Sequence, residues 1–161
     1  MIRAKVCFVA EGVSIDRETN LVSAFGLLET LHPDSYPLFL QRISFLCVWE
    51  REGTDPQRCR GEFSITLDGQ DISRQSIDID FLHHLRNKTT IRLNGFVVSQ
   101  PGNIVFRLAI PGHDQAEYVV IAGPATPAAR APDTTGAWPS NPLYETGPVS
   151  VAFGHINFRP E

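Results

Sequence analysis

Short apolar runs, each ended by turn-forming residues after roughly 8–12 positions, most restrict how this chain can fold. Residues 62–68 are the clearest example, because Phe63, Ile65 and Leu67 alternate with polar residues before an Asp-Gly turn sequence. A period of two is that of a half-buried strand. The repeated pattern predicts an all-β fold, an antiparallel β-sandwich of eight or nine strands with Greek-key-like connections.

Eight segments before residue 123 carry this strand signal: 2–10, 21–31, 41–50, 62–68, 72–79, 89–98, 104–110 and 117–122. Segment 41–50 is apolar on both faces in its second half and is expected to be a central strand, whereas the polar segment 72–79 suits a sheet edge. A crossover with room for one helical turn is expected at 81–87. The residues expected in the core are Val6, Phe8, Phe45, Phe63, Ile65, Leu67, Ile91, Leu93, Phe106, Leu108 and Val120.

Residues 21–31 fit two patterns. Leu21, Phe25 and Leu28 follow a helical period, and several neighbours are good helix formers. Gly26 lies in the middle, and a glycine there costs a helix about 1 kcal/mol relative to alanine. The short length and the glycine favour a strand.

The composition changes after residue 123. Residues 124–161 hold seven of the twelve prolines and only five charged residues. This predicts a sandwich domain at 1–123 and a Pro-rich extension at 124–161. Within the extension, 149–158 fits a ninth strand, because Val149, Val151 and Phe153 are in phase. Such a strand can return to its own sheet edge or add to the edge of a neighbouring molecule.

Two parts of the sandwich region resemble a known family. Residues 19–28, TNLVSAFGLL, followed by Tyr36-Pro37, are similar to its opening motif, and residues 100–108, QPGNIVFRL, are similar to its ending. The family consists of small bacterial all-β proteins of unknown function. The resemblance covers about residues 2–122. It implies a sandwich scaffold with a strand at 21–31, and it implies no functional residues.

Composition disfavours several classes of function. The 161 residues are 42% hydrophobic and carry a formal net charge of −4. Global disorder is therefore excluded, and binding of nucleic acid through overall charge is disfavoured. No run approaches the roughly 18 apolar residues of a spanning helix, so no membrane partner is expected. The apolar stretch after Lys5 ends at Glu11, too early for a secretory signal, and a cytoplasmic location is expected.

The three cysteines have no paired spacing, so neither a disulfide framework nor a zinc site is expected. Cys7 and Cys47 lie in apolar runs and fit small buried side chains. Cys59 stands between two arginines, which would lower its thiol pKa if the side chain is exposed. The alternative is an ordinary thiol near a turn.

Two groups of residues offer metal ligands. Around the expected crossover, carboxylates and imidazoles that suit a divalent metal are present at Asp78, Asp80, His83 and His84. Adjacent histidines point apart, so a solvated loop is the simpler interpretation. Asp68 and Asp71, with Asp16 in another loop, offer oxygen ligands for calcium, although their spacing is not that of an EF-hand.

No catalytic motif is present. The chain has neither a Gly-x-Ser-x-Gly sequence nor a glycine-rich phosphate loop, and His32, Asp34 and Ser35 are close only in sequence. We therefore expect a non-catalytic binding or assembly module, with no cofactor or metal, that acts through a sheet edge, end loops or the C-terminal extension. Its partner would be another protein or a second copy, as in a homodimer. The alternative is a metal-dependent enzyme or a calcium-dependent binding site in the Asp68–His84 region. The residues expected on the interaction surface are Trp138, Tyr144, Phe153 and Phe158.

Overall fold

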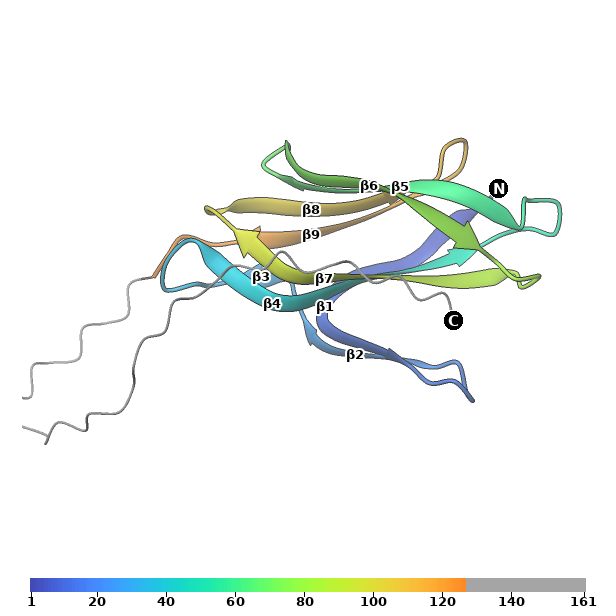
Figure 1. The fold of residues 1–161 in the computed structure, drawn as a ribbon, viewed down its shortest axis with the longest axis horizontal. Coiled ribbons are helices and arrows are strands. Elements are labelled where there is room, and N and C mark those ends of the chain that lie inside the picture. The colour runs from blue at the N-terminus through green and yellow to red at the C-terminus, as the bar shows by residue number, and fades with distance from the viewer. Residues whose placement is uncertain (127–161) are drawn as a thin grey trace, which may run out of the picture.

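A computed structural model describes residues 1–126 as two β-sheets packed face to face, which confirms the predicted β-sandwich (Figure 1). The strands are β1 (Arg3–Ile15), β2 (Val22–Leu27), β3 (Thr30–Leu31), β4 (Leu38–Glu50), β5 (Arg58–Leu67), β6 (Gln70–Asp80), β7 (Arg86–Val98), β8 (Gly102–Ala109) and β9 (Gln115–Ala122). Within these 126 residues there is no helix, including at the crossover, where a helical turn had room to form.

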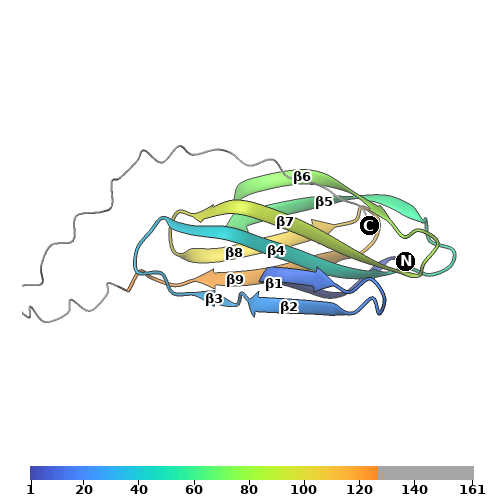
Figure 2. The ribbon, with the colours of Figure 1, turned by 60° about the horizontal axis from the view of Figure 1, so that its bottom comes forward.

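The strand order is β2-β1-β4-β7 in the four-stranded sheet and β3-β9-β8-β5-β6 in the five-stranded sheet (Figure 2). The chain crosses between the sheets after β2, β3, β4, β6 and β7. As expected, β4 is central and β6 is an edge strand. All pairs are antiparallel except β3 with β9, which is parallel.

Aromatic side chains join the two sheets across the core. Phe45 of β4 and Phe63 of β5 have ring centroids 5.3 Å apart, and Phe96 of β7 lies 5.9 Å from Phe106 of β8. Such tilted pairs add stabilisation beyond the burial of their area. Of the eleven predicted core residues, eight are buried: Phe45, Phe63, Ile65, Leu67, Ile91, Phe106, Leu108 and Val120.

The other predictions for the core need correction. Val6 is exposed, and Phe8 and Leu93 are only half-buried. The cause in β1 is a register shift between Ala4 and Val6 in the pairing with β4. One extra residue in a strand moves every following side chain to the opposite face. Val6 and Phe8 therefore lie on the outer face, and Cys7 and Val9 lie on the inner face.

Residues 21–31 form strands, as predicted, but two of them rather than one. The first, β2, pairs with β1, and the second, β3, belongs to the opposite sheet. Gly26, near the end of β2, has a φ of 62°, a conformation that glycine adopts without strain. The break between the two strands lets the chain change sheets.

The β1–β2 hairpin does not continue the plane of its sheet. β1 pairs with β4 only through Arg3–Ala10 and with β2 through Ala10–Ile15, and Figure 1 shows the hairpin swinging out below the sheet. The turn at the end of the hairpin contacts β7, the opposite edge strand of the same sheet. There the Lys88 ammonium donates to the Asn20 side-chain oxygen at 2.7 Å and to the Asn20 carbonyl. The hairpin and the outer face of the four-stranded sheet thus enclose a wedge.

Candidate functional site

The predicted metal ligands near the crossover are engaged in other interactions. The Asp78 carboxylate accepts from Arg60 at 3.1 Å, and the Asp80 carboxylate accepts from Arg58 at 2.7 Å. Asp80 also accepts from the Leu82 amide at 2.9 Å, which is the main reason that the pKa of this carboxyl lies below its ordinary value. Neither Asp78 nor Asp80 therefore joins the two histidines in a ligand set.

The carboxylates considered for calcium are also in use. Asp68 accepts from the Asn103 amide at 2.8 Å, and with Gly69 it forms the tight turn predicted from the sequence. Asp71 accepts from Arg74 at 3.1 Å. Among residues 1–126 no group of three or more His, Cys, Asp or Glu side chains is arranged to hold a metal ion.

Cys59 is not the activated thiol that its two neighbouring arginines suggested. Successive residues of a strand point to opposite faces. Arg58 and Arg60 therefore lie on the outer face with their β6 partners, while Cys59 packs partly buried against the core. Burial raises the pKa of its thiol instead of lowering it. A lowered pKa was expected only for an exposed side chain, and the strand alternation does not leave Cys59 exposed, so the alternative of an ordinary thiol fits.

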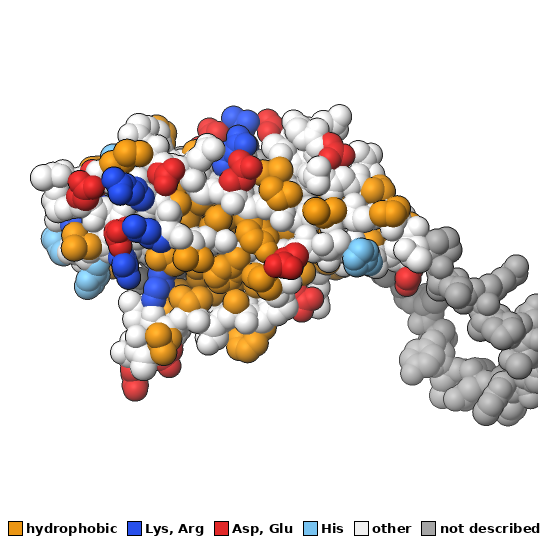
Figure 3. Space-filling view, turned by 180° about the vertical axis from the view of Figure 1, so that it is seen from behind, with side chains coloured by type: hydrophobic (Ala, Val, Ile, Leu, Met, Phe, Trp, Pro, Cys, Tyr) orange, Lys and Arg blue, Asp and Glu red, His pale blue; other side chains and the backbone are white. Residues whose placement is uncertain are grey.

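An apolar surface that the sequence did not reveal lies along one side of the sandwich. We call it the apolar flank, and it consists of large exposed side chains of β1, β2 and β9: Val6 at 52% exposure, Phe25 at 63%, Leu27 at 51%, Val119 at 43% and Ile121 at 50%. Figure 3 shows hydrophobic side chains gathered in the middle of this side, with charged residues around them. Contiguous exposed apolar surface of this kind marks interaction sites.

Two strand edges are open along the same flank, within the described part of the chain. Residues 3–8 of β1 pair with β4 on one side, and on the other side the neighbouring chain pairs only from Val9 onward, where the Leu28 amide donates to the Val9 carbonyl at 2.9 Å. Residues 115–120 of β9 pair with β8, while β3 reaches only Ile121 and Ala122. Open edges present unpaired backbone groups to an incoming strand.

A shallow groove of about 200 Å³ separates the two open edges, and Cys7 is one of the residues that line it. The Cys7 thiol donates to the Glu117 carbonyl oxygen across the groove, with 3.1 Å between sulfur and oxygen. At one end the Asp114 carboxylate accepts from the Ala4 amide at 3.0 Å. Burial raises the pKa of the Cys7 thiol, so the thiol is alkylated slowly. Because Cys7 lines the groove, its alkylation rate reports whether another segment covers the groove.

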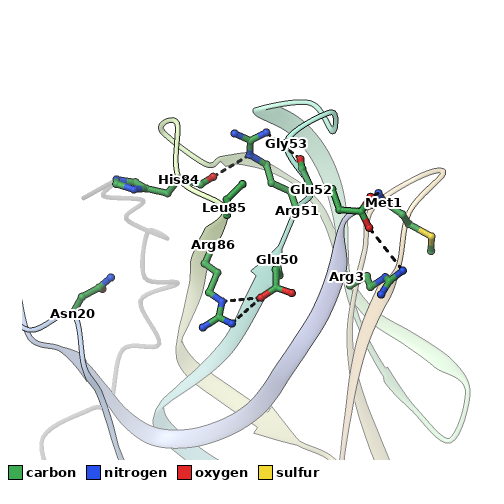
Figure 4. A pocket seen from close by; sticks show the side chains of 10 residues that line it. All are labelled: Met1, Arg3, Asn20, Glu50, Arg51, Glu52, Gly53, His84, Leu85 and Arg86. Carbon is green, nitrogen blue, oxygen red and sulfur yellow. Dashed lines mark hydrogen bonds and ion pairs between the residues drawn. The ribbon is translucent and has the colours of Figure 1, made fainter.

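The wedge below the four-stranded sheet opens into a larger cleft of about 830 Å³ (Figure 4). The upper wall of the cleft, which we call its roof, is formed by three adjacent strands. In the strand register, Arg3 of β1 lies opposite Glu50 of β4, and Glu50 lies opposite Arg86 of β7. Asn20 lies at the hairpin side. The N-terminal residue, the loop after β4 and the end of the crossover complete the lining with Met1, Arg51, Glu52, Gly53, His84 and Leu85. The cleft has the size of small-molecule sites.

Arg51 closes the upper end of this cleft. The side chain is only 6% exposed, and its hydrogen bonds go to backbone carbonyl oxygens: His84 at 3.0 Å, Asp55 at 2.9 Å and Glu52 at 3.4 Å. Its guanidinium also lies 5.8 Å from the centre of the Phe81 ring. Arg51 therefore fastens the loop after β4 to the crossover and brings a buried positive charge to the cleft.

The four residues predicted for an interaction surface, Trp138, Tyr144, Phe153 and Phe158, lie outside the described residues. Among residues 1–126 there is no helix long and apolar enough to cross a membrane. In comparisons with known proteins, no family model and no curated protein matches the chain.

Proposed function

We propose that this protein is a non-catalytic assembly module that forms a homodimer in the cytoplasm. The docking surface is the apolar flank. The docking element is segment 149–158, which a second copy supplies as an added strand. The exposure of five large apolar side chains beside two open strand edges is the observation that carries the proposal.

The flank fits strand addition better than a flat contact. Open edges supply backbone hydrogen bonds, and neighbouring apolar side chains supply contacts for alternate residues of the incoming strand. Segment 149–158 matches both needs, because Val149, Val151 and Phe153 alternate with smaller residues and 149–158 contains no charged residue. Reciprocal exchange between two copies gives a closed two-fold dimer in which both flanks are covered.

The chain has enough length for this exchange. The described part ends beside β3, where the Thr126 amide donates to the Pro33 carbonyl at 3.0 Å. Residues 127–148 separate this point from the segment, and an extended chain spans at most about 3.3–3.6 Å per residue, so 22 residues reach up to roughly 70 Å. An eight-residue strand such as β9 is about 27 Å long. The segment can therefore reach along a flank, and the oligomeric state shows whose flank it covers.

Free thiols support the cytoplasmic part of the proposal. Cys7 and Cys47 are partners in the β1–β4 register, and all three cysteines are free. A reducing compartment keeps neighbouring thiols in this form. Mass measurement of protein from its native cell, blocked at lysis with an alkylating agent, should find all three thiols modified. A Cys7–Cys47 disulfide would argue for an oxidising compartment.

The test of assembly uses the full chain with Val151→Asp/Phe153→Asp, and Ser150→Asp/Ala152→Asp as the control with the same charge on the other strand face. Light scattering after size-exclusion chromatography should show a dimer for the wild type. The first variant should be a monomer, and the control should weaken the dimer less. Wild type that is monomeric at about 100 μM would overturn the proposal, since interfaces of standard size associate well below that.

Thiol alkylation shows where the segment binds. Cys7 lines the groove, whereas Cys59 lies in β5, and burial raises both pKa values. Val151→Asp/Phe153→Asp should speed the modification of Cys7 and leave Cys59 unchanged. Equal rates at Cys7 in variant and wild type would place the docking surface elsewhere. A monomeric wild type with a protected Cys7 would mean that the segment covers its own flank, which contradicts assembly.

A further inference from the structure

The wedge cleft between the β1–β2 hairpin and the four-stranded sheet carries more positive than negative charge. Five cationic side chains line it or hold its lining residues: Arg3, Lys5, Arg51, Arg86 and Lys88. Three carboxylates belong to the same neighbourhood: Glu50, Glu52 and Asp55. The local excess is positive although the whole chain has a formal net charge of −4.

The carboxylates leave much of this positive charge unneutralised. Glu50 accepts from Lys5 at 2.9 Å and from Arg86 at 2.8 Å, so one carboxylate serves two cations. Arg3 approaches Glu52 only at 3.9 Å, the limit of an ion pair. An arginine has five N–H donors and a lysine three, so these side chains keep donors for another acceptor.

The hydrogen bonds described above for two further cations all go to neutral oxygens. Lys88 binds the side-chain oxygen and the carbonyl of Asn20, and Arg51 binds three backbone carbonyls. Carbonyls satisfy the hydrogen bonds of a buried guanidinium without cancelling its charge, and a buried charge is costly when it has no counter-charge. An anion in the cleft would supply that counter-charge.

We propose that the wedge cleft binds a small oxyanion that carries more than one negative charge, through phosphate or carboxylate groups. Arg3 and Arg86 on the roof are the primary ligands, because the guanidinium fork matches both groups. Lys88 holds the hairpin tip that forms the opposite wall. Leu85 on the rim offers apolar contact to the remainder of the ligand. This site is separate from the apolar flank and does not depend on assembly.

The test is calorimetric titration of the full chain with two probes, inorganic pyrophosphate and citrate, at low and high salt. Arg3→Gln/Arg86→Gln should weaken binding by about tenfold or more, because charge-assisted hydrogen bonds are lost. The control, Arg60→Gln/Arg74→Gln, removes the same charge from the outer face of the other sheet and should leave binding unchanged. The tighter of the two probes identifies phosphate or carboxylate as the preferred group.

For a second variant we expect tighter anion binding instead of weaker binding. Glu50→Gln releases Lys5 and Arg86 from their carboxylate and should tighten binding severalfold. Three results would overturn the proposal: no binding of either probe at about millimolar concentration, an equal loss in the two double variants, or weaker binding by Glu50→Gln. Val151→Asp/Phe153→Asp should bind the probes like the wild type, so failure of this site and failure of assembly are told apart.

Discussion

The two long sides of the sandwich both contain exposed strand edges, but they carry opposite kinds of side chains. On the β5–β6 side, outward residues form a ladder of opposite charges: Arg58 with Asp80, Arg60 with Asp78, and Arg74 with Glu62 and Asp71. On the apolar flank, outward positions of β1, β2 and β9 carry valine, phenylalanine, leucine and isoleucine. Both sides contain strand edges. A continuous ladder of ion pairs covers the first, whereas on the flank the charges of Lys5 and Glu117 stand beside exposed apolar side chains.

This difference determines how each side of the sandwich interacts with another polypeptide chain. Charged side chains on an edge strand such as β6 prevent pairing with other chains, because pairing would desolvate them. Apolar side chains beside an open edge do the reverse and make burial favourable. In the proposed dimer, one side of the fold is therefore protected against contact and the other side is the docking surface.

The largest expected effect comes from the core that both sides share. Phe63 lies on the inner face of β5, directly behind the charge ladder, with its ring 5.3 Å from that of Phe45. Phe63→Ala should lower the free energy of unfolding by about 3–5 kcal/mol, because the cavity cannot collapse between two sheets. Urea denaturation followed by tryptophan fluorescence measures this loss. A loss below about 1 kcal/mol would show that Phe63 is not part of the common core.

The second prediction places charged side chains on the apolar flank. Val6→Lys/Val119→Lys puts charges on the flank and should weaken dimerisation at least about tenfold, while stability changes by less than about 1 kcal/mol. The matched control, Ser73→Lys/Ser76→Lys, adds the same charge to exposed positions of β6 and should leave dimerisation as it is. Sedimentation at several concentrations compares them. Equal effects would mean that net charge, and not the flank, governs association.

How far the sequence predicts this architecture differs between the same two sides. The alternation at 62–68 and the Asp68–Gly69 turn were sufficient to predict β5, its inward residues and the hairpin to β6. On the flank the alternation failed, because the register shift between Ala4 and Val6 turns β1 over, and nothing local marks it. Gly95 has a similar effect in β7: at a φ of 71° it precedes a change of phase that buries Phe96 and exposes Val97.

Long-range features of the two candidate sites were also beyond the sequence. The flank unites strands that are more than a hundred residues apart, and the cleft requires the hairpin to fold back until Asn20 meets Lys88. Hydrophobic period reports which face of one strand is buried, but it does not report which strands become neighbours. The crossover expected at 81–87 was placed nearly correctly, since residues 81–85 connect β6 to β7 and the two histidines there interrupt the strand patterns.

A smaller effect should appear in the acid range at the end of the ladder. The Leu82 amide and then Arg58 hold the pKa of Asp80 below its ordinary value of about 3.9. A carboxyl with a lowered folded-state pKa stabilises the fold above its unfolded pKa, and the contribution is lost as pH falls through the folded pKa. Asp80→Asn should therefore lower Tm at pH 7, and the difference from the wild type should shrink as the pH falls through the acid range. A difference in Tm that stays constant over this range would contradict the role of the charge.

The smallest effect is expected for one rung of the ladder. Arg74 is about half exposed and contacts Glu62 and Asp71, each at 3.1 Å. Exposed pairs contribute about 0.2–1 kcal/mol, so Arg74→Gln should lose no more than that in urea denaturation at low salt, and the loss should fade at about 1 M salt, where screening acts within about 3 Å. Arg74→Lys keeps the charge and should behave as the wild type. A salt-independent loss above about 2 kcal/mol would make the ladder a source of stability. The expected small loss agrees with the proposal that the ladder mainly keeps the β6 edge apart from other strands.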